Sequence, residues 1–399
     1  MRNIIQNNLK GDKALWAFII LLALFSFLPV YSASSNLVYT VGSGTVLSHM
    51  IKHAGFLLGG LLIIFFVQRF DYKWFGVIAI FGVFITSIIL LFTALMGTTI
   101  EGANAARWLS IPGIGVGIQP SVLASQALLI YIARYLTINR NKQPNLQNIF
   151  LYLFLPIVVV VGLILPANGS TALMLLFMCG VLLFIGGFPT KYLLGVGLVC
   201  GILIGLFIYI ALYFPDLIPN TRVHTWMSRI NKFFNDEGVE GYQVLRAKAA
   251  IAKGLVEMAG PGKSVFKQTL PQSSSDFIFA IIVEEYGLFG ALFLIGVFTF
   301  ILYRICVIAT KIHTIFGTLL VFAVGMPIII QAFVNMAVAV SLFPVTGQPL
   351  PLISYGGTSL WMTCISFGVI LSVSTKIKSK EEIELEKELN SEEVIEDIA

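Results

Sequence analysis

One aspartate, Asp276, stands where a long polar loop enters an apolar helix, in the segment LPQSSSDFIFAIIVEEYGLFG from residue 270 to 290. A carboxylate at such a boundary is the first place to look for chemistry, because Asp and Glu serve as general acids and bases. Two further carboxylates, Glu284 and Glu285, follow about two helical turns later. Isolated charges are costly in lipid, so this pair must face protein, water or a cation. It is as well suited to capping helices or ordering the loop as to reacting.

Basic side chains are frequent in the polar loop before Asp276, residues 215–275. They are Arg222, Arg229, Lys232, Arg246, Lys248, Lys253, Lys263 and Lys267. Two interpretations stay open: a solvated loop that binds anionic headgroups, or a site for a phosphate-bearing lipid, where Lys and Arg supply charge-assisted hydrogen bonds. In another loop, Arg107 and Trp108 suit a membrane interface, since tryptophan anchors at headgroup depth and arginine can reach a phosphate.

The elements that position these residues cross a membrane. Of the 399 residues, 57% are hydrophobic and 11% charged, and the mean hydropathy is +0.92, which excludes a set of soluble domains with polar surfaces. A spanning helix needs roughly 20 apolar residues. Ten stretches qualify: 14–32, 46–67, 74–96, 118–136, 150–166, 171–187, 192–214, 277–308, 315–342 and 358–374. The sequence therefore predicts an all-α polytopic membrane protein with about ten transmembrane helices.

The distribution of Lys and Arg predicts how the chain is oriented in the membrane. Lys and Arg collect in the short loops on one side, which predicts that both termini are cytoplasmic. The loops 97–117, 215–275 and 343–357 then face the opposite compartment. Residues 1–375 form the membrane domain, with 215–275 as a large extracytoplasmic loop between helices 7 and 8, and 376–399 form a charged cytoplasmic tail.

The four cysteines lie in apolar stretches without CxxC spacing, so neither a disulfide framework nor a zinc site is indicated.

Two of the outer loops carry their own structural signals. Residues 241–260 of the large loop, GYQVLRAKAAIAKGLVEMAG, have helical spacing of apolar residues, which favours an amphipathic helix along the membrane surface. The loop PVTGQPLPLISYGGTS contains three prolines and three glycines, which predicts a folded, non-helical connection between spans nine and ten.

Four motifs in order resemble a known family. GANAARWL with QPS, GYQ followed by GPGKSVFKQTLP, SDFIFAIIVEEYGLFGA, and PVTGQPLPLISYGGTS are similar to motifs of the SEDS proteins of shape, elongation, division and sporulation, in particular FtsW and RodA. The resemblance implies a peptidoglycan glycosyltransferase of the bacterial cytoplasmic (inner) membrane that polymerises lipid II for the cell wall. It implies a class B penicillin-binding transpeptidase as partner, within the cell division or cell shape machinery, and no nucleic acid. An FtsW-like division role is favoured over elongation.

The family's essential carboxylate falls on Asp276, which we expect to be the general base on the acceptor hydroxyl, with undecaprenyl pyrophosphate leaving. The substrate-binding residues expected from the matched motifs are Arg107, Gln119, Arg246, Lys263 and Lys267. Of these, Arg107, Lys263 and Lys267 are candidates for stabilising the pyrophosphate. A divalent cation, Mg²⁺ or Mn²⁺, is compatible with that role but not firmly implied, and no metal ligands are assigned.

The chain departs from the family's usual pattern. An acidic residue after QPS and a following lysine are replaced by Val122 and Ser125, and the motifs PANGSTAL and LPQSSSD lack their usual charges. Losing both members of a buried ion pair strands neither charge. Because Asp276 is retained, an active enzyme is favoured. The alternatives are a lipid II flippase, another lipid-linked sugar polymerase or ligase, and a noncatalytic division scaffold.

Overall fold

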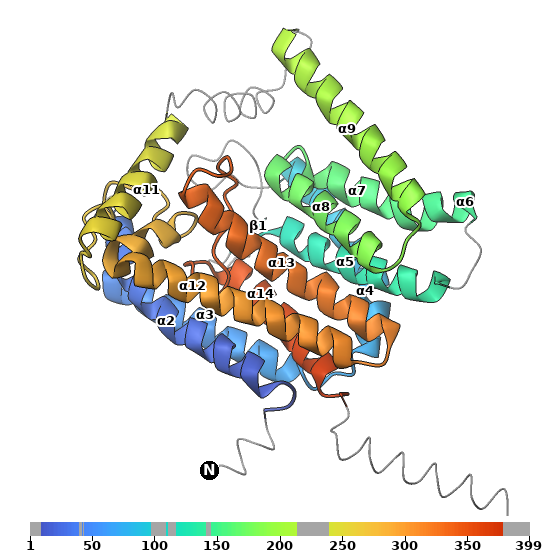
Figure 1. Ribbon diagram of the computed structural model, residues 1–399, viewed down its shortest axis with the longest axis horizontal. Helices are drawn as coiled ribbons and strands as arrows, with labels where there is room; N and C mark the ends of the chain where they lie inside the picture. The colour runs from blue at the N-terminus through green and yellow to red at the C-terminus, as the bar shows by residue number, and fades with distance from the viewer. Residues whose placement is uncertain are drawn as a thin grey trace, which may run out of the picture.

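The computed structural model describes residues 9–39, 42, 44–96, 109–110, 117–140, 145–213 and 239–377. Helices dominate these residues (Figure 1). They are α2 (Lys13–Tyr39), α3 (Val46–Val67), α4 (Lys73–Met96), α5 (Pro120–Asn139), α6 (Leu146–Ile149), α7 (Leu155–Ile164), α8 (Gly169–Ile185), α9 (Thr190–Tyr213), α11 (Val239–Val256), α12 (Ile278–Lys311), α13 (Ile315–Ala339) and α14 (Gly357–Ser374). The only strands among them, β1 (Leu109–Ser110) and β2 (Gly117–Ile118), form a small antiparallel pair.

The predicted helical membrane fold is confirmed. Among the described residues, 8 helices are long and apolar enough to cross a bilayer, and Gly169–Ile185 and Thr190–Ile202 are shorter apolar helices at the places of the sixth and seventh predicted spans. One span differs in detail, because residues 146–164 include a π-helical turn, η1 (Phe150–Phe154), between α6 and α7. Hydropathy measures apolar content, so it does not distinguish the i→i+5 hydrogen bonds of a π-helical turn from those of an ordinary α-helix.

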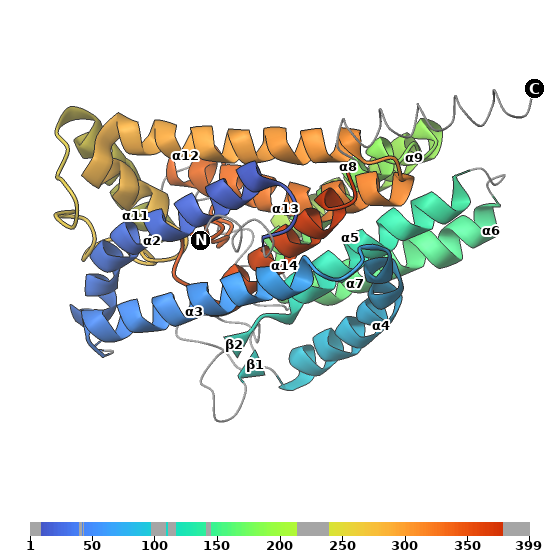
Figure 2. The ribbon, with the colours of Figure 1, turned by 90° about the horizontal axis from the view of Figure 1, so that it is seen from below.

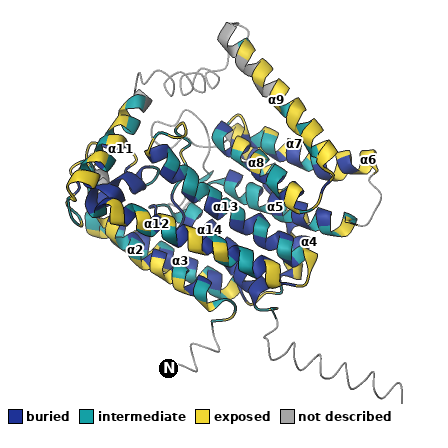
Figure 3. Cartoon of the chain, viewed as in Figure 1, coloured by how far each residue is buried: buried dark blue, intermediate teal, exposed yellow. Residues whose placement is uncertain are grey.

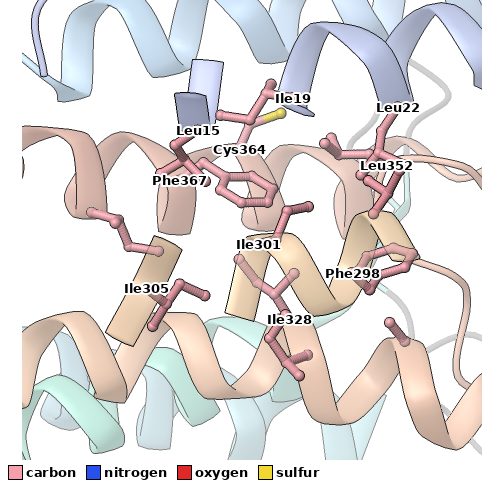
Figure 4. Close-up of a cluster of buried hydrophobic side chains, with 14 of the residues drawn as sticks. Leu15, Ile19, Leu22, Phe298, Ile301, Ile305, Ile328, Leu352, Cys364 and Phe367 are labelled. Carbon is pink, nitrogen blue, oxygen red and sulfur yellow. The ribbon is translucent and has the colours of Figure 1, made fainter. Parts of the chain in front are cut away.

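Two hydrophobic cores meet on α13. The first joins α2, α3, α12 and α14, and Figure 4 shows Leu15 and Ile19 of α2 facing Phe367 of α14, with Ile301 of α12 and Ile328 of α13 below. The second joins α5, α7 and α8, and α13 contributes Leu319 and Ala323 to it. The apolar windows of α14 and α13 are 78% and 61% buried, against 22% in α3 and α4, so α13 and α14 are the central helices. Figure 3 shows the exposed residues on the outer helices, and α9 leaning away from the bundle.

Polar side chains fix where several helices begin. Thr45 and Ser48 form a reciprocal capping box at the start of α3, and the side chains of Asn168 and Thr314 accept backbone N–H groups at the starts of α8 and α13. Such caps satisfy donors that would otherwise be unpaired at a helix end. Elsewhere in the bundle, Arg304 of α12 binds Asp12 through Nε and Nη2, and the Asp12 N–H donates to Ser374 Oγ at 2.9 Å. These contacts join the start of α2 to the C-terminal parts of α12 and α14.

The loops predicted to face outward have the predicted secondary structure where they are described. The expected helix at 241–260 is α11, which lies against the first turns of α12 in both views of the fold (Figures 1 and 2). The connection between α13 and α14, residues 340–356, is non-helical as predicted. Residues 214–238 of the large loop, Arg107 and Trp108, and the tail from 378 lie outside the described residues.

Candidate active site

Asp276 lies in a tight turn, residues 271–277, immediately before α12. The turn is anchored by buried Ser273, Ser274 and Phe277, while the Asp276 side chain stays partly exposed. Gln272 adopts a positive φ of 56°, and its carbonyl accepts the N–H groups of Ser275 at 3.1 Å and Phe277 at 3.2 Å. Asp276 is therefore presented by a folded turn with fixed neighbours, which is the preorganisation that a general base requires.

The loop between α13 and α14 holds this turn from the other side. Tyr355 N–H donates to the Ser274 carbonyl at 2.9 Å, and Ser354 Oγ donates to the Ser275 carbonyl at 2.6 Å. Ser354 Oγ in turn accepts the Leu350 N–H at 2.7 Å. Two segments about 80 residues apart in the chain are thus joined by one backbone–backbone bond, at Ser274, and one side chain–backbone bond, at Ser275.

Tyr355 also connects the loop to α3. Its hydroxyl lies 3.3 Å from Nδ1 of His49, a buried residue of α3. Burial raises the pKa of the Tyr355 hydroxyl above its ordinary value, so the group stays protonated and neutral. The turn that carries Asp276 is therefore supported, through Tyr355, by a transmembrane helix of the first core.

Asn335, near the outer end of α13, fixes the backbone on both sides of the site. Its Nδ2 donates to the Asp276 carbonyl at 2.8 Å and to the Gln348 carbonyl at 2.7 Å. Gln348 donates onward to Thr171 Oγ1 of α8 at 2.8 Å, and Gln331 donates to the Pro349 carbonyl at 2.7 Å. Amides buried in apolar helices are costly unless they are hydrogen-bonded. An Asn or Gln within an apolar span is therefore the signal that could have pointed to Gln331 and Asn335 from the sequence. The sequence analysis had not singled them out.

A central cavity of about 70 Å³ opens beside this network. Gly347 lies at its wall, and a Cβ added to Gly347 would be 3.5 Å from Asp276 Oδ2. The lining contains no charged residue and combines apolar side chains, such as Leu129, Met174 and Ile328, with amides and hydroxyls. The amides are Gln119, Gln126, Gln331 and Gln348. Gln119, predicted as a substrate-binding residue, is thus placed at the cavity next to Asp276. Amides and hydroxyls in a concave site can bind the hydroxyl and acetamido groups of a sugar.

Gly347→Ala tests the close approach of this loop to Asp276. Gly347 has a φ of +68°, so alanine there costs about 1–2 kcal/mol in strain and also places a methyl group against the carboxylate. We expect kcat/KM of the catalysed reaction to fall by about tenfold, equivalent to about 1.4 kcal/mol. Gly260→Ala is the matched control, because Gly260 has a φ of +85° and meets only Lys263 at 3.9 Å. Equal activity losses in both variants would show that strain alone is responsible.

Val122 and Ser125, the positions of the missing charges, both line the cavity. They are three residues apart on α5 and therefore share one helix face. We expect Val122→Glu alone and Ser125→Lys alone to lower the thermal unfolding midpoint, because each buries an unpaired charge. The double variant should recover part of the loss, with a coupling free energy of roughly 0.5–3 kcal/mol in a double-mutant cycle. Additive losses would show that the two side chains do not meet across the helix face.

Glu284 and Glu285 face protein, as expected from the cost of an isolated charge in lipid, and both bind the loop that follows α11. Both side chains are buried, at 0% and 1% exposure. Glu284 accepts the N–H of Val265 at 2.9 Å and the hydroxyl of Ser264, while Glu285 accepts the N–H of Ser264 at 3.2 Å and the hydroxyl of Ser32. The two carboxylates thus attach the loop after α11 to α12 and α2.

The predicted cationic residues lie around that same loop. Arg246 stacks its guanidinium over the rings of Tyr242 and Phe266, at 5.0 and 6.0 Å from their centroids. Lys267 Nζ donates to the Gly262 carbonyl at 2.6 Å, and Lys263 is exposed. α11 shares a buried cluster with Phe277, the residue after Asp276, through Ala247 and Ala250. The cationic loop is therefore packed onto the helix that Asp276 begins, but none of these three residues lines the central cavity.

No group of three or more His, Cys, Asp or Glu side chains that could hold a metal ion occurs in the part of the chain that the structure describes.

Comparison with known proteins places this arrangement in context. The sequence family of FtsW, RodA and SpoVE, described as "Cell cycle protein", matches residues 12–379. A protein of Saccharophagus degradans named "Probable peptidoglycan glycosyltransferase FtsW" is 32% identical over 333 residues, covering 80% of each chain. An Enterococcus hirae protein of the same name is 29% identical over 401 residues, covering 95% of this chain and 98% of its own.

Two solved structures have the same fold. A chain in a structure described as "Structural coordination of polymerization and crosslinking by a peptidoglycan synthase complex" aligns with a TM-score of 0.72 and 25% identity, covering 91% of this chain and 97% of that chain. The rod shape determining protein RodA of Thermus thermophilus aligns with a TM-score of 0.64 and 24% identity, covering 94% of this chain and 100% of its own.

Proposed function

Because the chain belongs to the FtsW, RodA and SpoVE family of cell cycle proteins, we propose that it is a peptidoglycan glycosyltransferase that polymerises lipid II into β-1,4 glycan strands. The observation that carries this proposal is the placement of Asp276, which lies beside Gly347 at the wall of an uncharged cavity. The turn that carries it is held by hydrogen bonds from α13 and the loop 340–356. Relatives in Saccharophagus degradans and Enterococcus hirae, which align over most of the chain, are named as probable peptidoglycan glycosyltransferases.

The proposed chemistry needs one base. The acceptor hydroxyl of a GlcNAc residue attacks the anomeric carbon of the donor sugar, and Asp276 accepts the hydroxyl proton as the new bond forms. The pyrophosphate leaves as a stable anion and needs no proton, so a second carboxylate is unnecessary, in contrast to glycoside hydrolysis. A single displacement inverts the anomeric centre and gives the β linkage.

Negative charge develops on the leaving pyrophosphate and requires nearby cations. We propose Lys263 and Arg107 for this role, since Lys263 is exposed on the loop that packs against α12. Arg107 lies outside the described residues. Lys267 and Arg246 are held by a carbonyl and by aromatic rings, so in this proposal they shape the loop and supply a positive field. The proposed steps involve no metal ion, and the assay below measures whether Mg²⁺ changes the rate.

The proposed setting is the bacterial cytoplasmic membrane, with both termini cytoplasmic and Asp276 on the outer face. The related synthase-complex structure supports a class B penicillin-binding transpeptidase as partner, which would cross-link the strands that this chain makes. The relatives named FtsW favour a role in cell division. Lipid II is the proposed substrate of this pairing.

Purified protein with its co-expressed transpeptidase should be supplied with fluorescent lipid II, with and without Mg²⁺, and the products resolved by gel electrophoresis. Strands that lysozyme digests would establish the polymerase. A flippase would instead move lipid II across proteoliposomes without lengthening it, so translocation is measured in parallel. A scaffold would do neither and would act only through the cross-linking activity of its transpeptidase partner.

A further inference from the structure

A second cavity lies where α5 and α8 end and α6 and α9 begin, and Figure 1 shows these four ends on one side of the molecule. Its volume is about 290 Å³, near the lower end of the roughly 300–1,000 Å³ typical of small-molecule sites. α5 has 20 residues, so its two ends are roughly 30 Å apart, which is the thickness of the hydrocarbon core. Because Gln119 at the start of α5 lines the cavity near Asp276, the second cavity lies at the opposite membrane boundary.

The lining of the second cavity offers one cation and several amides. Apolar side chains such as Leu136 and Phe188 form part of the wall, and the polar residues are Tyr135, Asn139, Arg140, Asn145 and Asn148. Asn139 Nδ2 donates to the Tyr135 carbonyl at 2.9 Å, which uses one of its two hydrogens. The lining therefore contains donors for an oxygen-rich ligand.

The positive charge at this cavity is not balanced by a carboxylate. Arg140 is the only charged residue in the described lining, and its side chain is exposed. None of the ion pairs in the described part of the chain involves Arg140. Between residues 102 and 215 the sequence contains no Asp or Glu, but it contains Arg107, Arg134, Arg140, Lys142 and Lys191. A site with a cation, amide donors and no carboxylate favours an anion, because each polar contact is then charge-assisted or donated by the protein.

Exposed apolar side chains adjoin the second cavity. Ile138, Phe150 and Phe184 are exposed, and each lies within two residues of a lining residue. All three belong to apolar helices of the membrane bundle, where exposed side chains contact acyl chains. A free anion gains nothing from these side chains, whereas a phospholipid can place its phosphate in the cavity and its acyl chains beside them.

We propose that the second cavity binds the phosphate of an anionic phospholipid in the leaflet opposite Asp276, with Arg140 as the cation and the amides of Asn139 and Asn148 as donors. In the orientation proposed above this is the cytoplasmic leaflet, where basic pockets between helices bind anionic headgroups. The simpler alternative is a solvated Arg140 that only complements the carbonyls at the end of α5. That alternative predicts no preference among lipid headgroups and no effect of a carboxylate placed in the lining.

Asn148→Asp tests the preference for an anion, because it adds a carboxylate to the lining with almost no change of shape. Gln147→Glu is the matched control, since Gln147 is the preceding residue, is likewise exposed and does not line the cavity. Each full-length protein is titrated in detergent with dioleoyl phosphatidylglycerol or dioleoyl phosphatidylcholine, and bound lipid is counted by native mass spectrometry. We expect Asn148→Asp to weaken phosphatidylglycerol binding by about tenfold and Gln147→Glu to bind as wild type does.

Arg140→Gln removes the cation and should weaken phosphatidylglycerol binding by about tenfold as well, while Arg140→Lys keeps the charge and should retain most of the affinity. Lys311→Gln is the control, because Lys311 is an exposed cation at the end of α12, at the same boundary, and does not line the cavity. The proposal is overturned if a control weakens binding as much as its partner variant. It is also overturned if all proteins bind equally, or if wild type binds phosphatidylcholine as tightly as phosphatidylglycerol.

A second measurement places the bound lipid and separates it from a free phosphate. A phosphatidylglycerol that carries a diazirine in an acyl chain is photolysed with wild-type protein in phosphatidylcholine nanodiscs, and the labelled peptides are identified by mass spectrometry. We expect labelling at residues 145–155 and 180–190 that unlabelled phosphatidylglycerol displaces and inorganic phosphate does not. Displacement by inorganic phosphate would show a site for the free anion, and labelling confined to other helices would place the lipid elsewhere; either result contradicts the proposal.

Discussion

Asp276→Asn protein is expected to make no measurable glycan from lipid II, a loss of at least about 10²–10⁴ in rate, which is the usual contribution of a general base. Asparagine has nearly the same shape but cannot accept the proton of the attacking hydroxyl. The fold around it should persist, because Asn335 donates to the Asp276 backbone carbonyl, which the substitution keeps. Polymerisation of fluorescent lipid II by the purified complex measures the effect.

Ser275→Ala is the neighbouring control. Ser275 Oγ donates to Gln272 Oε1 at 2.7 Å, so alanine removes a local contact in the same turn without touching the base. We expect this variant to retain most of its activity. The thermal midpoint and the yield of transpeptidase complex must match wild type for both proteins. Full activity in a folded Asp276→Asn complex would remove this residue from the mechanism and favour a scaffold.

Glu284→Gln is expected to cause the largest loss of stability, about 3 kcal/mol or more, since charge-assisted bonds to buried donors contribute about 1.5–3 kcal/mol each. The carboxylate accepts the Ser264 hydroxyl and the N–H groups of Val265 and Phe266. It also lies 3.7 Å from Lys253 Nζ of α11. An amide presents N–H groups toward these donors. The loop after α11 should detach, which trypsin cleavage after the exposed Lys263 would report together with a lower thermal midpoint.

Glu257→Gln provides the comparison at an exposed carboxylate on the turn that follows α11. Surface substitutions of this kind change stability by about 0.5 kcal/mol or less. Cleavage after Lys263 should therefore stay at the wild-type rate in this variant. If Glu284→Gln were equally resistant to trypsin, the buried carboxylate would not be what holds the loop to α12.

Much of the fold follows from composition because the bilayer allows few solutions. Long apolar runs had to be helices, and the structure has helices at all ten predicted places. The π-helical turn at Phe150–Phe154 was not predictable, since its residues are as apolar as those of an ordinary helix. The packing of α13 between two cores was equally hidden, because hydropathy alone does not say which apolar faces meet.

The candidate site was predictable only in part. Asp276 stood out as the carboxylate at the point where a long polar loop enters an apolar helix, and Gln119 because of its motif. Asn335 and Gln331 of α13 were missed, although an amide inside an apolar span is costly to bury for the same reason as a charge, at lower strength. Their partners could not be read from the sequence, because the contact between Asn335 and the Asp276 carbonyl depends on how α13 and α12 pack. Arg246 and Lys267 were expected at substrate, and the structure gives both of them partners within the protein.

The backbone of α12 breaks its helical path at Gly287, where φ is 61° and ψ is −151°. Before the break, the carbonyls of Glu284 and Glu285 accept the N–H groups of Ala259 and Gly260, and Met258 packs against Gly287 itself. The turns from Ile278 to Glu285 are therefore bonded on one side to α11 and its loop. On the other side, Ile278, Phe279, Ile282 and Val283 pack into the first hydrophobic core. A displacement of α11 would thus have to be transmitted through residues of the membrane core before it reached the aspartate.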